Sequence, residues 1–127
     1  MATTHIKDST GFLTLSATIL NSAQISEEVT IPSNYVVVGI IPPTSWDGGN
    51  ITISSAHTTG GTFFEHYDSG DASTAAASLI INTPVANKIH GIAPSHMIGL
   101  MGYVKINSAS TVSADREITL ILQHTSL

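Results

Sequence analysis

Short segments in which apolar and polar residues alternate constrain this chain more than any other feature. In residues 12–20, FLTLSATIL, apolar side chains alternate with threonine and serine, which is the period of two of a half-buried β-strand. Residues 50–56 and 116–125 show the same alternation, and residues 35–41, YVVVGII, are a continuously apolar, β-branched run. Such a run is typical of a strand that is covered on both faces. These segments predict a β-protein with almost no helix.

Clusters of Gly, Pro, Asn, Asp and Ser separate about eight strand-like segments. The segments are residues 12–20, 25–31, 35–41, 50–56, 62–68, 78–83, 97–107 and 116–125. Because the turn signals recur at near-regular spacing, we predict an all-β fold, a single-domain antiparallel β-sandwich with jelly-roll or immunoglobulin-like topology. We expect residues 12–127 to form this domain and the polar residues 1–11 to precede it as an N-terminal arm.

The charge balance limits the partners that this chain can bind. Of its 127 residues only 4 are Lys or Arg, and the formal net charge is -5. A basic stripe that follows a nucleic-acid backbone cannot be built from so few cations, so we expect no direct nucleic-acid partner. Charged residues make up 10% of the chain, well below the roughly 25% of typical soluble domains. Either other subunits cover part of the surface, or the surface is neutral and rich in Ser and Thr.

The sequence contains no cysteine, which excludes disulfides and thiolate chemistry and leaves the redox compartment open. Its first residues lack the apolar segment of a secretion signal, and no apolar stretch approaches the about 20 residues that span a bilayer. We therefore expect synthesis and folding in a cytosol, and no membrane partner.

Titratable residues do not form a recognisable catalytic set. Glu27 and Glu28 are neighbours on a predicted strand, so they point to opposite faces and cannot flank one bond. We interpret them as edge charges that discourage unwanted strand pairing. His57, His66 and Asp68 could hold a metal ion across a hairpin, although a solvated or hydrogen-bonded strand histidine is the simpler interpretation. Because nucleotide-binding and nucleophile-elbow motifs are also absent, we predict no enzyme activity, no cofactor and no metal site.

The corner between the segments 35–41 and 50–56 concentrates residues with special backbone and side-chain properties. It contains Pro42, Pro43, Trp46, Asp47, Gly48 and Gly49. The prolines end the preceding strand because proline cannot donate to a ladder, and the Asp-Gly-Gly sequence tolerates the positive φ of a reversal. We interpret Trp46 as a plug that closes the end of the sandwich by burying about 150–250 Å². The alternative is a platform on which a sugar ring stacks.

Two longer stretches, VVVGIIPPTSWDGGNITISSAHTTGGTFFEHYDSGD and GYVKINSASTVSADREITLIL, resemble a family of small virion proteins of tailed bacteriophages. The shared elements are Gly39-Ile40-Ile41-Pro42-Pro43, Trp46, Ile51 to Ser55, Gly61-Thr62-Phe63-Phe64, Asp68-Ser69-Gly70, Tyr103-Val104-Lys105-Ile106 and Arg116. The resemblance spans residues 35–122 and consists of structural motifs. One departure is Ala56-His57-Thr58-Thr59, where the family usually has a Ser-x-Asp-Gly type of turn.

The resemblance implies a non-enzymatic β-sandwich that decorates or cements a phage head shell. Its partners would be the major capsid protein or other virion proteins, and its location would be the capsid surface of the virion after synthesis in the host cytoplasm. A cement protein bridges neighbouring capsid subunits, so symmetry multiplies each modest contact. A homo-oligomer is expected, and the three-fold positions of capsids favour a trimer. The alternative is a module of the neck, tail or a fibre that contacts host glycans or other virion proteins.

Two segments are candidates for partner contacts. The polar arm supplies His5, Ile6 and Lys7, and the apolar, Gly-interrupted segment 90–102 supplies Met97, Ile98, Leu100 and Met101. The arm could order on a neighbour or stay disordered. Apolar segments that contain methionine suit adaptable interfaces, although a core strand with a flanking loop also explains this one.

Overall fold

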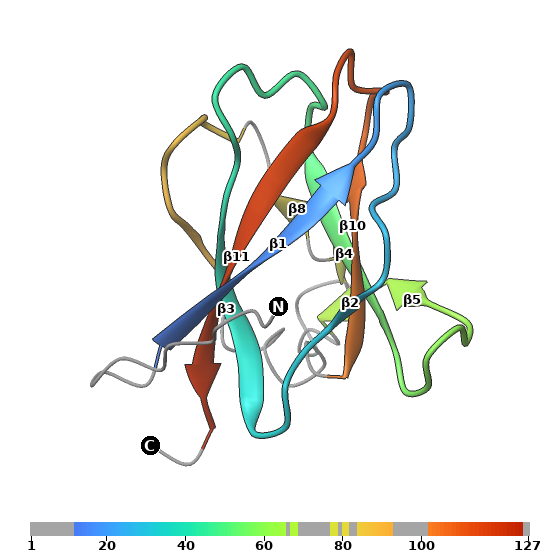
Figure 1. Ribbon diagram of the computed structural model, residues 1–127, viewed down its shortest axis with the longest axis vertical. Coiled ribbons are helices and arrows are strands. Elements are labelled where there is room, and N and C mark those ends of the chain that lie inside the picture. The colour runs from blue at the N-terminus through green and yellow to red at the C-terminus, as the bar shows by residue number, and fades with distance from the viewer. Residues whose placement is uncertain are drawn as a thin grey trace, which may run out of the picture.

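Two antiparallel β-sheets pack face to face as a sandwich (Figure 1). The computed structural model describes residues 12–65, 67–68, 77–78, 80–81, 84–92 and 102–125, and no helix occurs among them. Over the same residues, nothing in the structure is a helix of the length and apolarity that a membrane span requires. The predicted all-β class is confirmed.

Sheet A has four strands in the order β1, β11, β3 and β9. Their bounds are β1 Phe12–Ile19, β11 Arg116–His124, β3 Tyr35–Ile41 and β9 His90–Gly91. All neighbours in this sheet are antiparallel. β1 pairs with β11 over its whole length and without a register shift, from Phe12 opposite Gln123 to Ile19 opposite Arg116.

Sheet B follows the order β2, β10, β4 and β5, and it is also antiparallel. The bounds are β2 Val29–Thr30, β10 Tyr103–Ser108, β4 Ile51–Ala56 and β5 Phe64–Glu65. A further strand, β8 (Ile80–Ile81), pairs with the first half of β4 while β5 pairs with its second half. Since β10 occupies the other edge of β4, β5 and β8 share one edge and the sheet is four strands wide. Among the described residues, the strands β6 (Tyr67–Asp68) and β7 (Ala77–Ser78) pair only with each other.

The strand order identifies the topology. When the eight strands that define the two sheets are counted in chain order, without β6, β7 and β8, β9 is the sixth, β10 the seventh and β11 the eighth. Sheet A then has the order 1-8-3-6 and sheet B the order 2-7-4-5. This arrangement of two interlocked Greek keys is the jelly roll. The prediction of a sandwich of about eight strands is confirmed, and of the two predicted topologies the chain adopts the jelly roll.

The core lies between the sheets and follows the alternation of the sequence. In β11, Ile118, Leu120 and Leu122 are fully buried, whereas Thr119 and Ile121 between them are half-exposed. The largest fully buried side chains are Ile19, Ile40, Ile51, Ile53, Ile106, Ile118, Leu120, Leu122, Val37, Val104 and Val112. Burial of one such aliphatic side chain stabilises the fold by about 1.5–3 kcal/mol. These inward rows therefore hold the two sheets together.

Two predicted strands are shorter in the structure than in the sequence pattern. Of the segment 25–31, only Val29–Thr30 is a strand. The reason is Ser26, whose N–H donates to the Ile106 carbonyl at 2.9 Å while its hydroxyl oxygen accepts the Ile106 N–H, also at 2.9 Å. A side chain replaces a main-chain acceptor there, so the regular ladder begins only at Val29. The segment 62–68 is divided because β5 pairs with β4 and β6 pairs with β7.

Candidate functional site

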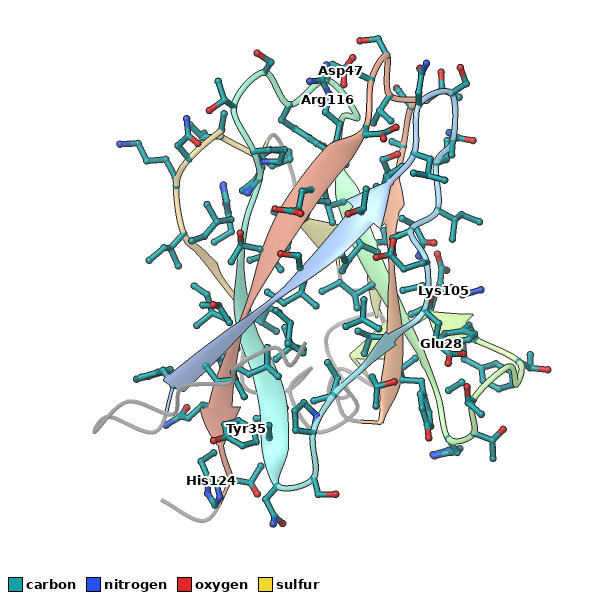
Figure 2. All side chains as sticks on the ribbon, viewed as in Figure 1. Glu28, Tyr35, Asp47, Lys105, Arg116 and His124 are labelled. Atoms are coloured by element: carbon teal, nitrogen blue, oxygen red, sulfur yellow. The ribbon has the colours of Figure 1, made fainter. Side chains whose placement is uncertain are left out.

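The corner that follows β3 lies at one end of the sandwich, where Figure 2 labels Asp47 and Arg116. Trp46 is half-buried and packs against the core, and its Nε1 donates to the Gly49 carbonyl at 2.9 Å. Gly48 lies against the indole so closely that a Cβ added to it would be 2.5 Å from two indole carbons and 2.8 Å from the Ser108 Cβ. Only glycine fits between the Trp46 ring and Ser108 without a shift of one of them.

The Asp47 carboxylate connects this corner to the start of β11. Its Oδ1 accepts a hydrogen bond from Arg116 Nε at 3.1 Å, and its Oδ2 accepts the N–H of Ser113 at 3.1 Å and the Ser113 hydroxyl at 2.6 Å. Arg116 also donates to the Ser113 hydroxyl oxygen at 3.2 Å. The Ser113 hydroxyl and then the Arg116 guanidinium lower the pKa of Asp47 from 3.8 to about 2, because both stabilise the ionised form. A carboxylate so engaged is an anchor and not a proton donor near neutral pH.

Main-chain hydrogen bonds hold the corner against two other loops. The Ser110 N–H donates to the Gly48 carbonyl at 2.8 Å, and the Asn87 N–H donates to the Pro42 carbonyl at 2.9 Å. The corner is thus joined to the β10–β11 connection on one side and to the loop before β9 on the other. These contacts fit a structural joint with Trp46 as its plug, and they leave only part of the indole exposed to a sugar ring.

Glu28 holds the loop between β4 and β5, a contact that the sequence did not predict. Its Oε2 accepts the Thr59 hydroxyl at 2.5 Å and its Oε1 accepts the Gly60 N–H at 2.8 Å. The Thr59 hydroxyl, then the Gly60 N–H and more weakly the Lys105 ammonium lower the pKa of Glu28. Figure 2 shows Glu28 and Lys105 close together on the side of the sandwich where β5 lies. We call the contacts of Glu28 with Thr59 and Gly60 the Glu28 clasp.

The clasp holds the end of the β4–β5 loop, which follows Ala56 and includes His57, Thr58 and Thr59. Further along this loop, the Phe63 ring lies under Lys105 Nζ, 4.6 Å from the ring centre. A cation above a ring face is attracted to the electrons of that face. The edge-charge interpretation of Glu28 misses these contacts, since the carboxylate bonds within the fold.

The residues of the conceivable metal site are not brought together in the described part of the chain. His57 is exposed in the β4–β5 loop, whereas His66 and the side chain of Asp68 lie outside the described residues. No group of three His, Asp or Glu side chains with metal-binding geometry occurs in the described ranges. His90 Nε2 instead accepts the Val85 N–H at 2.9 Å, and the His124 ring packs edge-on against Tyr35 at 5.1 Å between centroids.

The predicted partner contacts His5, Ile6, Lys7, Met97, Ile98, Leu100 and Met101 all lie outside the described residues. Among the described residues, large apolar side chains are exposed at other places. Leu20 and Ile25 are 60% and 57% exposed on the connection from β1 to β2, and Ile89 is 68% exposed beside β9. Apolar surface is therefore available on loops that the sequence pattern did not mark as contacts.

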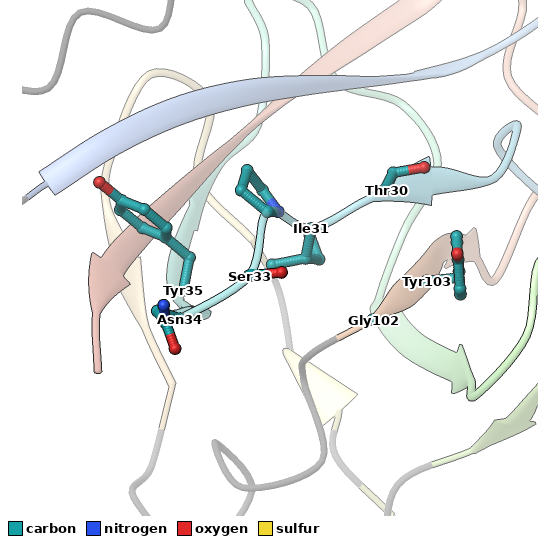
Figure 3. Close-up of a pocket in the computed structure, with 8 residues that line it drawn as sticks. Thr30, Ile31, Ser33, Asn34, Tyr35, Gly102 and Tyr103 are labelled. Atoms are coloured by element: carbon teal, nitrogen blue, oxygen red, sulfur yellow. The ribbon is translucent and has the colours of Figure 1, made fainter. Parts of the chain in front are cut away.

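Two open hollows in the surface have volumes of about 580 Å³ each. The first, drawn in Figure 3, lies between the β2–β3 connection and the start of β10, and Ser33, Asn34 and Tyr103 give it hydroxyl and amide groups. The second lies where β1 ends and includes Leu20 and Glu27. Both hollows are widely open to solvent.

Comparisons of the chain with models of protein families, with curated proteins and with solved structures found no match. Functional inference therefore depends on the residues and geometry described above.

Proposed function

We propose that this chain is a non-enzymatic structural protein of a tailed-phage virion, which binds the head shell as a cement or decoration protein. Its partners are the major capsid protein or other virion proteins, and its place is the capsid surface after synthesis in the host cytoplasm. The sequence resemblance over residues 35–122 supports this function. So does the surface of sheet A, which is the observation that carries the proposal.

The outer face of sheet A is almost free of charge. Side chains that point away from the core alternate along β1, β11 and β3. The pairing of these strands places those side chains in rows across the outer face. Its exposed and half-exposed members are Phe12, Thr14, Ser16, Thr18, Ile41, Thr119, Ile121 and Gln123. We call these residues the neutral face. Glu117, opposite Thr18, is the single charged residue on the outward rows of β1, β11 and β3.

A neutral face of this kind suits contact with another protein. The centres of protein interfaces are depleted of charged residues, because burial of an unpaired charge is costly. Threonine, serine and glutamine retain hydrogen-bonding groups, so the face can meet a polar protein surface as well as an apolar one. Repetition over a symmetric shell then adds many weak contacts into a strong one. A homo-oligomer fits this function, and capsid three-fold positions favour a trimer.

A module of the neck, tail or a fibre that contacts host glycans is the second candidate. The hollow of Figure 3 favours it, because Tyr103, Asn34 and Ser33 combine an aromatic ring with amide and hydroxyl groups around one open volume. Trp46 supplies less support, since its indole is half-buried and its Nε1 is bonded to Gly49. Under this proposal, Tyr103→Ala lowers glycan binding and Trp46→Ala does not.

The copy number of this chain in purified particles tests the proposal. We expect quantitative mass spectrometry to find copies in a fixed, lattice-wide ratio to the major capsid protein. A copy number of about a dozen or fewer per particle, as in a neck or tail, would instead support the second candidate function. Absence from purified particles would refute both virion functions.

A further inference from the structure

Two exposed apolar side chains line an open hollow at the end of β1 (Figure 1). Leu20 is 60% exposed and Ile25 is 57% exposed. The hollow has a volume of about 580 Å³, and its other lining residues are Thr18, Ala23, Ser26 and Glu27. We call it the β1-end hollow. Exposed apolar side chains that gather around one concave surface with a polar rim indicate a binding site for a protein segment.

Hydrogen bonds hold both walls of the β1-end hollow. On one wall, the Ser26 N–H donates to the Ile106 carbonyl at 2.9 Å, which attaches this wall to β10. Glu27 joins the same wall to the other one, because its Oε1 accepts the Thr18 N–H of β1 at 3.0 Å. The shape of the hollow is therefore fixed by the fold, and binding of a segment requires little ordering of its walls.

Three exposed carboxylates lie around the β1-end hollow. Glu27 lines it, Glu117 lies opposite Thr18 in the register of β1 and β11, and Asp115 accepts the Asn21 N–H at 2.8 Å. A segment with a positive charge next to an apolar side chain suits such a site. The charge meets the carboxylates, while the apolar side chain covers the apolar walls.

Residues 5–7, His5-Ile6-Lys7, combine an apolar side chain with a cation. The chain has only 4 Lys and Arg residues, and the three others have different positions or contacts. Arg116 forms its ion pair at the corner, Lys105 lies above an aromatic ring, and Lys88 precedes β9. β9 is at the edge of sheet A opposite β1. Lys7 is therefore the cation of this chain that best complements the carboxylates of the hollow.

The arm of the same chain is too short to bring its own Ile6 into the hollow. β1 begins at Phe12, and Leu20 follows its last residue, which is a distance of about 26 Å at about 3.3 Å per residue. The residues from Ile6 to Phe12 span at most about 22 Å when fully extended, and the arm would also have to reverse its direction at the start of β1. A second copy has no such limit.

The described residues that flank the other undescribed ranges are not neighbours of the hollow. β5 and β8 flank ranges between residues 65 and 84, and they pair with the edge of β4 that faces away from β10. β9 and Gly102 are on either side of residues 93–101. β9 is the edge strand farthest from β1 in sheet A, and Gly102 precedes the start of β10, whereas the hollow adjoins Ile106.

We propose that the β1-end hollow binds residues 5–7 of a second copy of this chain. Ile6 of the second copy lies between Leu20 and Ile25, and Lys7 of the second copy faces Glu117. The contact is heterologous, because an arm binds a hollow and not another arm, so it can close a ring of copies. A ring of three copies is the trimer that we expect.

The test is the mass of the full chain and of single variants, measured by light scattering after size exclusion. Ile25→Asp in the hollow and Ile6→Asp in the arm should each raise the dissociation constant about tenfold or more, because a carboxylate replaces an apolar side chain that the contact buries. Ile89→Asp is the matched control, since Ile89 is 68% exposed beside β9, and it should leave the mass unchanged. Circular dichroism should show the same fold in all three variants.

Charge reversal tests the polar half of the contact. Lys7→Glu and Glu117→Lys should each raise the dissociation constant about twofold to fivefold at low ionic strength, the range for exposed ion pairs. The chain that carries both changes should assemble like the unmodified chain, because the ion pair is restored with its charges exchanged. A double variant that is weaker than either single variant would contradict the pairing of Lys7 with Glu117.

Carbodiimide crosslinking of a mixture of isotope-labelled and unlabelled chains distinguishes a second copy from the same chain. The reagent joins the Lys7 amine to a nearby carboxylate as an amide and takes up the water that is released. We expect crosslinks from Lys7 to Glu27 or Glu117 between one labelled and one unlabelled peptide. Crosslinks only between peptides of the same label, a monomeric full chain, or Ile6→Asp and Ile25→Asp variants that assemble like the unmodified chain would overturn the inference.

This inference does not rest on the virion function, and the two can fail separately. A chain that assembles through its arm but is absent from purified particles would keep the inference and refute the proposed function. A dimer that loses its mass in both the Ile6→Asp and the Ile25→Asp variant would keep the arm site and refute the trimer, because two copies can also exchange their arms with each other.

Discussion

A double-mutant cycle at Gly48 and Trp46 measures whether the indole is packed in solution as it is in the structure. A Cβ at Gly48 would be 2.5 Å from two indole carbons, about 1 Å less than the about 3.5–4.0 Å of a favourable carbon contact. Gly48→Ala should therefore destabilise the fold by about 1–3 kcal/mol, the usual cost of overpacking. Trp46→Ala should cost about 2–4 kcal/mol, somewhat below the value for a fully buried tryptophan, because the ring is half-buried.

The two costs should not add. Removal of the indole makes room for the alanine methyl group, so the double variant should be more stable than the sum predicts, by about 1–2 kcal/mol. Part of the destabilisation by Gly48→Ala should remain in the double variant, because the added methyl group would still lie 2.8 Å from the Ser108 Cβ. Urea unfolding followed by circular dichroism gives the free energy of unfolding of the unmodified chain and of the three variants. Fluorescence is unsuitable because Trp46 is the only tryptophan and two of the variants lack it.

Gly60→Ala is the matched control for this cycle. Gly60 has a positive φ of 69°, but a Cβ there would meet nothing within 4 Å. Its substitution should cost about 1–2 kcal/mol through backbone strain alone and should add to the cost of Trp46→Ala. If Gly48→Ala and Trp46→Ala were also additive within about 0.5 kcal/mol, the indole would not lie against Gly48 and the plug interpretation would fail.

Two further predictions concern the carboxylates. The pKa of Asp47 is about 2 in the folded protein, against an ordinary value of 3.8, so the ionised carboxylate stabilises the fold above pH 4 and this stabilisation is lost as the pH falls through 2. Asp47→Asn should therefore flatten the rise of the unfolding free energy between pH 2 and pH 4. Identical pH profiles of the variant and the unmodified chain would contradict the ion-pair anchor. Glu28→Ala removes the acceptor of the Gly60 N–H and should speed amide exchange there while leaving the core amides unchanged. Glu65→Ala, an exposed carboxylate on β5, is the control, and equal Gly60 exchange in the Glu28 variant would mean that the clasp does not form in solution.

Much of the fold could be predicted from the sequence because period-two alternation reports burial directly. The rows Leu13 to Ile19 and Ile118 to Leu122 are in the core, as their spacing implies. The hydrophobic pattern overestimates the length of the strand in residues 25–31, because it carries no sign that the Ser26 side chain replaces a main-chain acceptor. It also leaves the topology open, because alternation carries no information about which strands are neighbours.

The candidate contacts were less predictable for a different reason. The Glu28 clasp and the Asp47 anchor join residues that are 31 and 69 positions apart, and only the tertiary fold brings such residues together. The sequence marks Asp47 for its backbone properties, but its side chain also makes the long-range contact with Arg116. The position of β1 at the edge of sheet A is likewise a property of the sheet order and not of the strand's own sequence.

The placement of charge distinguishes the two explanations of the low charged fraction. A uniformly neutral, Ser- and Thr-rich surface would carry its few charges in an even scatter. Instead, Asp47 and Arg116 pair at one end of the sandwich, and Glu28 and Lys105 lie together on the side of sheet B. On the outward side of β1, β11 and β3, Glu117, opposite Thr18, is the only charged residue beside the neutral face. Among the residues that the structure describes, such segregation supports the proposed covered face, because selection for solubility alone gives no reason to clear one face of charge.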